Sequence, residues 1–241
     1  ENGMEANPSK FQGILLKGHS NDTVFNIDGT EMKTVDYVKF LGVNIDNNLD
    51  FHYHTNTICK KAGAQLRVLQ RLSHYLDLPS RLSIFRCFIL AHFNYCSLVW
   101  NFCGETCSRK IEQIQYRALK FVYNDFISDY NTLLKKANLP TLALARKRAI
   151  LIEVFKSIHH ISPPFMWDLF KTKESTYNLR RKNQLSIIQS NTKRYGSNSL
   201  SSCGANLWNT LPENIKMAKT LKDFKQLTDT KADQVRWDRS E

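Results

Sequence analysis

The sequence has no uninterrupted apolar run long enough to cross a membrane. Its most apolar stretch, from Ile84 to Trp100, contains Arg86, His92 and Asn94, whereas about 20 mostly apolar residues are needed to span a bilayer. The six cysteines have neither the density nor the regular spacing of a secreted, disulfide-stabilised domain. We therefore expect a protein without membrane segments that works in a reducing, intracellular compartment, either the nucleus or the cytoplasm.

Local signatures of common catalytic sites are also missing. The sequence contains neither a glycine-rich phosphate-binding loop nor a serine-centred nucleophile elbow, and no motif joins Cys203 to any histidine. We accordingly predict no catalytic residue and no small-molecule substrate. Four potential zinc ligands occur as His92-x3-Cys96-x6-Cys103-x3-Cys107. Their spacing matches no standard zinc finger, so core residues are the favoured interpretation and a zinc site is the alternative.

Acidic residues are scarce after residue 50. Residues 1–50 hold four Lys or Arg and eight Asp or Glu, whereas residues 51–241 hold thirty basic and fourteen acidic residues. The whole chain has a net charge of +12. Such asymmetry indicates contact with a polyanion, although a solvated basic surface that only aids solubility gives the same count.

The apolar pattern changes after Asp50. Three short apolar runs before it predict strands, with a turn at Asp28-Gly29 and with Gly42 inside the third run. After it, apolar residues recur at steps of three and four, which is typical of helices. Phe88 and Phe93 are expected on the buried face of the second helix. The expected helices cover about 58–72, 79–93, 109–123, 130–137 and 141–158, and a last one follows Thr220.

The first expected helix separates apolar from basic residues. Its apolar residues share one face, and its four Lys and Arg residues lie off that face. Such a helix can follow a nucleic-acid backbone and contact phosphates rather than bases. Later basic groups, Arg146-Lys147-Arg148, Arg180-Arg181-Lys182 and Lys193-Arg194-Tyr195, add to this pattern, and the last combines cations with an aromatic ring. The predicted nucleic-acid-binding residues are Lys60, Lys61, Arg67, Arg71, Arg180, Arg181, Lys193 and Arg194.

An ordered set of short segments resembles a known family. Asn2-Gly3-Met4, Asn7-Pro8-Ser9-Lys10 and the segment from Phe40 to Asp46, Phe-Leu-Gly-Val-Asn-Ile-Asp, are similar to the stretch after the catalytic site of LINE-type reverse transcriptases of jockey-like non-LTR retrotransposons. Residues 92–100, 110–119 and 204–212 resemble later parts of the same proteins. The resemblance implies that Phe40, Leu41 and Gly42 form the hairpin that grips the primer. It also implies that Lys10 lies near the triphosphate of the incoming nucleotide.

The carboxylates that such a polymerase needs are missing from this sequence. In the family an Asp-Asp pair holds the catalytic metal ions, and no Asp-Asp pair occurs among the 241 residues. The resemblance therefore matches the chain to the end of the palm, the thumb and the C-terminal region. We expect that the chain does not polymerise DNA by itself and holds no cofactor, Mg²⁺ being expected only for the full-length enzyme.

These patterns predict an α+β fold that is mostly α, with a small antiparallel sheet remnant followed by a helical thumb and a helical C-terminal region. The expected divisions are a palm remnant (1–50), a helical thumb-like and connecting domain (51–162), a basic, loop-rich linker (163–199) and a C-terminal helical segment (200–241). The expected partner is RNA or an RNA–DNA duplex, bound without sequence specificity. The alternative is an inert or protein-interaction helical remnant with no nucleic-acid role. The oligomeric state stays open.

Overall fold

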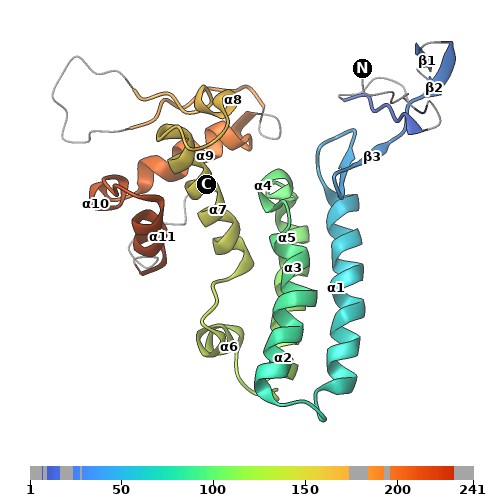
Figure 1. The fold of residues 1–241 in the computed structure, drawn as a ribbon, viewed down its shortest axis with the longest axis vertical. Helices are drawn as coiled ribbons and strands as arrows, with labels where there is room; N and C mark the ends of the chain where they lie inside the picture. The colour runs from blue at the N-terminus through green and yellow to red at the C-terminus, as the bar shows by residue number, and fades with distance from the viewer. Residues whose placement is uncertain are drawn as a thin grey trace, which may run out of the picture.

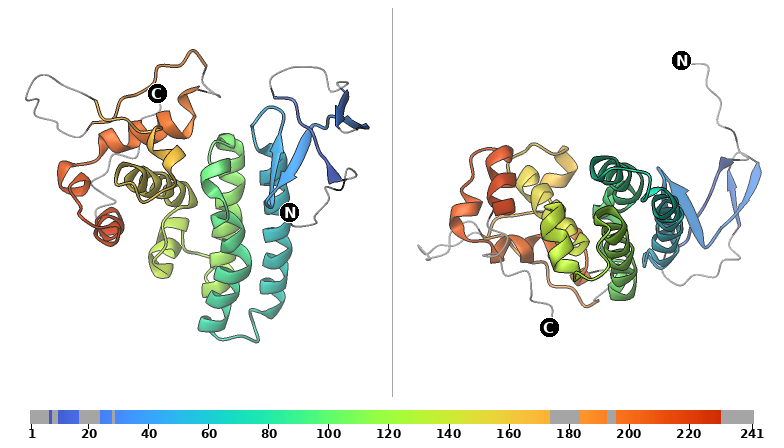
Figure 2. Two further views of the ribbon diagram at one scale, coloured as in Figure 1. Left: turned by 45° about the horizontal axis from the view of Figure 1, so that its top comes forward. Right: turned by 90° about the horizontal axis from the view of Figure 1, so that it is seen from below.

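The fold is mostly helical with a small antiparallel β region at its N-terminal end, as the sequence predicts. The computed structural model describes residues 7, 10–16, 24–27, 29–173, 184–192 and 196–230, and helix accounts for 59% of it. Two hairpins lie at one end of the molecule, the C-terminal helices lie at the other, and long helices run between them (Figures 1 and 2).

Two separate hairpins make up the β region. In the first, β1 (Val24–Ile27) pairs with β2 (Thr30–Lys33), and in the second, β3 (Tyr37–Phe40) pairs with β4 (Val43–Asp46). Both sheets are antiparallel and have two strands. The apolar run over 11–16 forms no strand and contributes only an isolated bridge from Gly13 to Thr34.

The turn between β3 and β4 is the two-residue loop Leu41-Gly42. Both residues lie in the left-handed region, with φ of 45° and 84°, and Phe40 pairs with Val43 across the turn. Positive φ at both central residues is the type I′ geometry that matches the twist of hairpin strands. Gly42 is thus at the turn and not inside a strand, and glycine adopts its φ of 84° without steric cost.

The first hydrophobic core lies among the helices that follow the hairpins. The long helices α1 (His52–Leu72) and α5 (Gly104–Tyr123) pack against each other. The π-helical segment η2 (Phe85–Leu90) lies between α2 (Leu78–Ile84) and α3 (Ala91–Asn94) in the sequence and packs on both α1 and α5. The short helix α4 (Ser97–Trp100) contributes Trp100 to the same core. Fully buried side chains of this core are Ala62, Leu69, Phe85, Ile89, Trp100, Ile111, Ala118 and Leu119.

Phe88 does not belong to this core, which corrects the sequence prediction. Its side chain is 55% exposed, whereas Phe85, Ile89 and Phe93 are at most 1% exposed. The cause is the π-helical segment over residues 85–90. A π-helix has more residues per turn than an α-helix, so residues four apart come into line and Phe88 turns outward.

A second core is built around α7 (Leu142–Ile158), which begins at the N-cap Thr141. Leu142 belongs to the first core, and the later residues of α7 belong to the second. They pack against α9 (Leu200–Thr210) and α11 (Leu221–Thr230), where the rings of Phe155 and Phe224 stack at 4.5 Å. The remaining helices are α6 (Tyr130–Ala137), α8 (Pro164–Trp167) and α10 (Glu213–Lys216).

Candidate nucleic-acid interface

Three cations of α1 lie in one line on its outer face. At 100° per residue, Lys60, Arg67 and Arg71 fall within about 40° of one another around the helix axis. The same rotation places the centre of the buried face on the opposite side, and the residues there are Ile58, Ala62 and Leu69. We call Lys60, Arg67 and Arg71, with Lys61 beside them, the α1 basic face. Its cations span about 16 Å along the axis at 1.5 Å per residue.

Within the described part of the chain, the α1 basic face has no compensating acid. All four cations are exposed, and none forms an ion pair with another described residue. The 21 residues of α1 include no Asp or Glu. Gly63 and Ala64 lie between Lys60 and Arg67, and the space around Gly63 is open. The helix backbone is therefore accessible between the cations.

Lys61 lies at the flank of this face, toward α3. Burial lowers the pKa of His54 on α1 and of His92 on α3, and the positive charge of Lys61 lowers both further. His54 accepts the backbone N–H of Asn44 at its Nδ1 atom, at 3.2 Å. The lowered pKa and this bond both correspond to a neutral imidazole, so the positive charge on this side of α1 belongs to Lys61.

A neighbouring helix adds a fifth cation that sequence reasoning did not select. Lys110 on α5 is exposed, and its Nζ donates to the Asn56 side-chain oxygen on α1 at 3.2 Å. Asn56 is one turn before Lys60, so Lys110 extends the α1 basic face across the α1–α5 contact. The pair is 54 residues apart in sequence, and only the packing of the two helices brings it together.

An exposed aromatic pair lies in line with the basic face at its N-terminal end. The rings of Tyr37 on β3 and Tyr53 on α1 stack with centroids 4.1 Å apart, and Tyr53 Oη donates to Tyr37 Oη at 3.2 Å. This hydrogen bond raises the pKa of Tyr37. Tyr53 precedes Lys60 by seven residues and so falls on the same line of the helix. The sequence signal was this seven-residue spacing, and the partner from β3 was not predictable.

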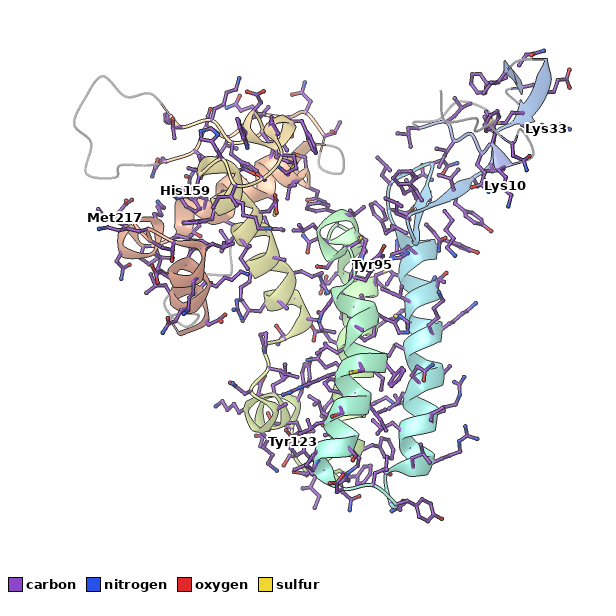
Figure 3. All side chains as sticks on the ribbon, viewed as in Figure 1. Lys10, Lys33, Tyr95, Tyr123, His159 and Met217 are labelled. Carbon is purple, nitrogen blue, oxygen red and sulfur yellow. The ribbon has the colours of Figure 1, made fainter. Side chains whose placement is uncertain are left out.

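The predicted primer-grip residues form the tip of the second hairpin. Phe40 and Leu41 are 63% and 74% exposed. Tyr95, which follows α3, donates its hydroxyl to the Leu41 carbonyl at 2.6 Å, and a Cβ on Gly42 would lie 3.3 Å from the Tyr95 ring. Figure 3 shows Tyr95 between the helices and this hairpin. One tyrosine thus holds the turn against the bundle and needs a glycine there.

The Asp46 carboxylate joins this hairpin to α1. Its oxygens accept the backbone N–H groups of Asn48, Asp50 and Phe51 at 3.1, 3.0 and 2.7 Å. Phe51 is the N-cap of α1 and has a left-handed φ of 57°. The second hairpin is therefore held to the start of α1 by hydrogen bonds at Asn44 and Asp46 of β4.

Lys10 and the basic group of α7 do not add to the α1 basic face. Lys10 is exposed and lies beside the N-terminal hairpins (Figure 3). Of the basic group on α7, Arg146 is only 5% exposed, and Arg148 forms an ion pair with Asp229, so neither offers a free cation to a polyanion. Four predicted residues lie outside the described part of the chain: Arg180, Arg181, Lys193 and Arg194.

The four potential zinc ligands do not assemble. Among the described residues, no three His, Cys, Asp or Glu side chains form a group that could hold a metal ion. Cys103 and Cys107 are fully buried, and burial raises the pKa of both thiols. Cys107 Sγ lies 2.9 Å from His52 Nδ1. The two cysteines belong to the first core, which is the interpretation that the sequence favoured.

Comparisons with known proteins give no further identification. In the part of the chain that the structure describes, no helix is both long and apolar enough to cross a membrane. A scan against protein-family models, a search of curated proteins and a search of solved structures found no match to this chain.

Proposed function

We propose that this chain binds RNA or an RNA–DNA duplex through the α1 basic face, without sequence specificity. The observation that carries the proposal is a 21-residue helix with four exposed cations and no acid on it. Phosphate contacts by Lys and Arg release counterions and supply most of non-specific affinity. Contacts of this kind fix the position of a nucleic acid but do not read its bases.

The surroundings of the face support a backbone contact. Open space at Gly63 lets a strand approach the helix closely. The stacked pair of Tyr37 and Tyr53 offers aromatic surface at one end of the line of cations. Tyrosine rings stack on bases or sugars with little sequence preference. A strand that follows α1 would thus meet cations along its length and an aromatic pair at the hairpin end.

The family resemblance supports the same surface. In jockey-like reverse transcriptases the segment similar to Phe40–Gly42 holds the primer, and the thumb begins after it. We propose that this chain is the corresponding part of such a polymerase and acts inside the cell, in the nucleus or the cytoplasm. Polymerisation itself is not proposed for this chain, because its sequence contains no Asp-Asp pair. Mg²⁺ would be required only together with those carboxylates.

The test is the salt dependence of duplex binding. A fluorescein-labelled RNA–DNA duplex is titrated by anisotropy at several salt concentrations against the wild type and the variant K60Q/K61Q/R67Q/R71Q. Each neutralised phosphate contributes about −0.9 to the slope of log K against log salt. Four lost contacts should reduce the steepness of the slope by about 3 to 4.

The matched control removes the same charge elsewhere. Variant K135Q/K219Q/K222Q/K225Q changes four exposed lysines of α6, α11 and the α10–α11 connection. It should keep the wild-type slope. An equal loss of slope in both variants would mean that only net charge matters. No salt-dependent binding by the wild type would favour the inert or protein-interaction alternative.

A further inference from the structure

A cavity of about 610 Å³ lies at the C-terminal end of α7, in the region of the second core. Its walls come from the end of α7, from α8 with the residues after it up to Lys173, and from Ser186. This size falls in the range of small-ligand sites. The lining residues include the hydroxyl of Ser157, the rings of His160, Trp167 and Phe170, and the cations of Lys171 and Lys173.

Two aromatic rings form a fixed corner of this cavity. The centroids of His160 and Trp167 are 4.3 Å apart, with ring planes at 75°. Trp167 Nε1 donates to the Ser162 carbonyl at 2.7 Å, which holds the indole in place. His160 has a left-handed φ of 54° at the end of α7, and the next N–H, from Ile161, returns to the Lys156 carbonyl at 2.8 Å. The corner is therefore preorganised.

Two lysines border the same cavity. Lys171 and Lys173 lie on either side of the antiparallel bridge between Thr172 and Leu185. Their backbones are tied to Ser186 and Gln184 by two hydrogen bonds of 2.8 Å. Both side chains are exposed. In the part of the chain that the structure describes, neither lysine pairs with an acid and no acidic side chain lines the cavity. Among these described residues the cavity combines an aromatic corner with positive charge.

We propose that this cavity binds one unstacked base of a single-stranded RNA or DNA together with its flanking phosphates. An aromatic surface that accepts a base face and cations that accept phosphates are the two elements of single-strand sites. The α1 basic face, in contrast, is a long exposed helix that suits a duplex backbone. The cavity is a second site on a different core, and it does not depend on the duplex proposal.

The first measurement locates the contact directly. An eight-nucleotide oligouridine containing 4-thiouridine is crosslinked to the full chain, and the modified peptides are identified by mass spectrometry. The expected crosslinks fall on residues 157–173 or on Ser186. Crosslinks confined to other segments, α1 included, would overturn the proposal.

The second measurement is the affinity of a fluorescein-labelled oligouridine of the same length for three variants. His160→Asn removes the ring but keeps a residue that tolerates the left-handed conformation. Loss of one base–aromatic stack should weaken binding by about fivefold to 150-fold. K171Q/K173Q should weaken binding and flatten its salt dependence by about 1.4, at about 0.7 per phosphate on a single strand. The matched control, K222Q/K225Q, makes the same charge change on α11 and should bind as the wild type.

The outcomes separate the two sites. If K60Q/K61Q/R67Q/R71Q abolishes oligouridine binding while His160→Asn and K171Q/K173Q retain it, the cavity proposal fails and the duplex proposal stands. If the cavity variants weaken oligouridine binding while K60Q/K61Q/R67Q/R71Q leaves duplex binding unchanged, only the duplex proposal fails. Equal competition by polyglutamate would also overturn the cavity proposal, because it would show a site for polyanions without need of a base. Thermal unfolding curves check that each variant is folded.

Discussion

The carboxylate of Asp46 connects the second hairpin to the segment that leads into α1. Its two oxygens accept three backbone N–H groups over residues 48–51. Two residues of this segment, Leu49 and Phe51, have left-handed φ values of 53° and 57°. Left-handed backbone costs about 1–2 kcal/mol for an ordinary L-residue. The carboxylate offsets this cost, so its removal leaves the strain and takes the acceptor from three N–H groups, of which that of Phe51 belongs to the most buried residue.

The size of the effect of Asp46→Ala follows from the three bonds. A hydrogen bond to a charged group contributes about 1.5–3 kcal/mol to stability, and a hydrogen bond between neutral groups contributes about 0.5–1.5 kcal/mol. The 2.7 Å bond to the N–H of Phe51, a residue only 6% exposed, belongs to the first class. The bonds to Asn48 and Asp50 are more exposed and weaker. We expect a loss of about 2–3 kcal/mol in the free energy of unfolding.

Urea unfolding followed by far-ultraviolet circular dichroism measures this loss. Hydrogen exchange over residues 43–58 should rise at the same time, because Phe51 and the first turns of α1 belong to the first core. The matched control is Asp168→Ala, which changes an exposed aspartate after α8 and should stay within about 0.5 kcal/mol of the wild type. If Asp46→Ala changes stability no more than Asp168→Ala does, the assigned role of the carboxylate is wrong.

Three further predictions test other parts of the structure. Tyr95→Phe removes the hydroxyl bond to the hairpin turn and should cost about 0.5–1 kcal/mol in urea unfolding, with faster hydrogen exchange over residues 37–46; unchanged exchange there would contradict the tie. Gly204→Ala places a Cβ 2.7 Å from a Phe170 ring carbon, so it should lower stability by about 1–3 kcal/mol; a neutral result would show that α9 moves freely. Burial raises the pKa of Cys59 to about 11, so its alkylation by iodoacetamide should be slow at pH 8 and rise about tenfold per pH unit up to about 11, as followed by mass spectrometry; a rate independent of pH in this range would contradict the raised pKa.

The sequence predicted the helical elements because their periodicity is local. The stripe from Ile58 to Leu69 is buried as expected. The last helix follows Thr220, as expected, and the Thr220 hydroxyl accepts the backbone N–H of Asp223 at 3.1 Å. The exception, Phe88, lies in a π-helical segment. Insertion of such a segment changes the period without a sequence signal as plain as proline or glycine, so a fixed 3.6-residue period assigned Phe88 to the wrong face.

The sequence could predict the cations of the candidate site but not the residues that tertiary contacts bring to them. The cations of α1 could be placed from helical spacing alone. The stack of Tyr37 on Tyr53, the contact of Lys110 with Asn56 and the hold of Tyr95 on the hairpin join residues 16 to 54 positions apart. For Arg146 the sequence was misleading. Its basic sequence neighbours suggested an exposed cation, but its guanidinium is buried, donates to Ser108 Oγ at 2.6 Å and lies over the Trp100 ring.

The two hairpins show why polar ties matter more than strand pairing for the proposed interface. An isolated two-stranded hairpin is marginally stable in water, and both sheets have only two strands. On β1, Val24, Phe25 and Ile27 are all 38–46% exposed, so this hairpin gains little from burial. The second hairpin buries Val43 to 3% exposure and is held by Asp46, by the bond from Asn44 to His54 and by Tyr95. Its tip therefore keeps a defined position relative to the α1 basic face, which a strand bound along that face would require.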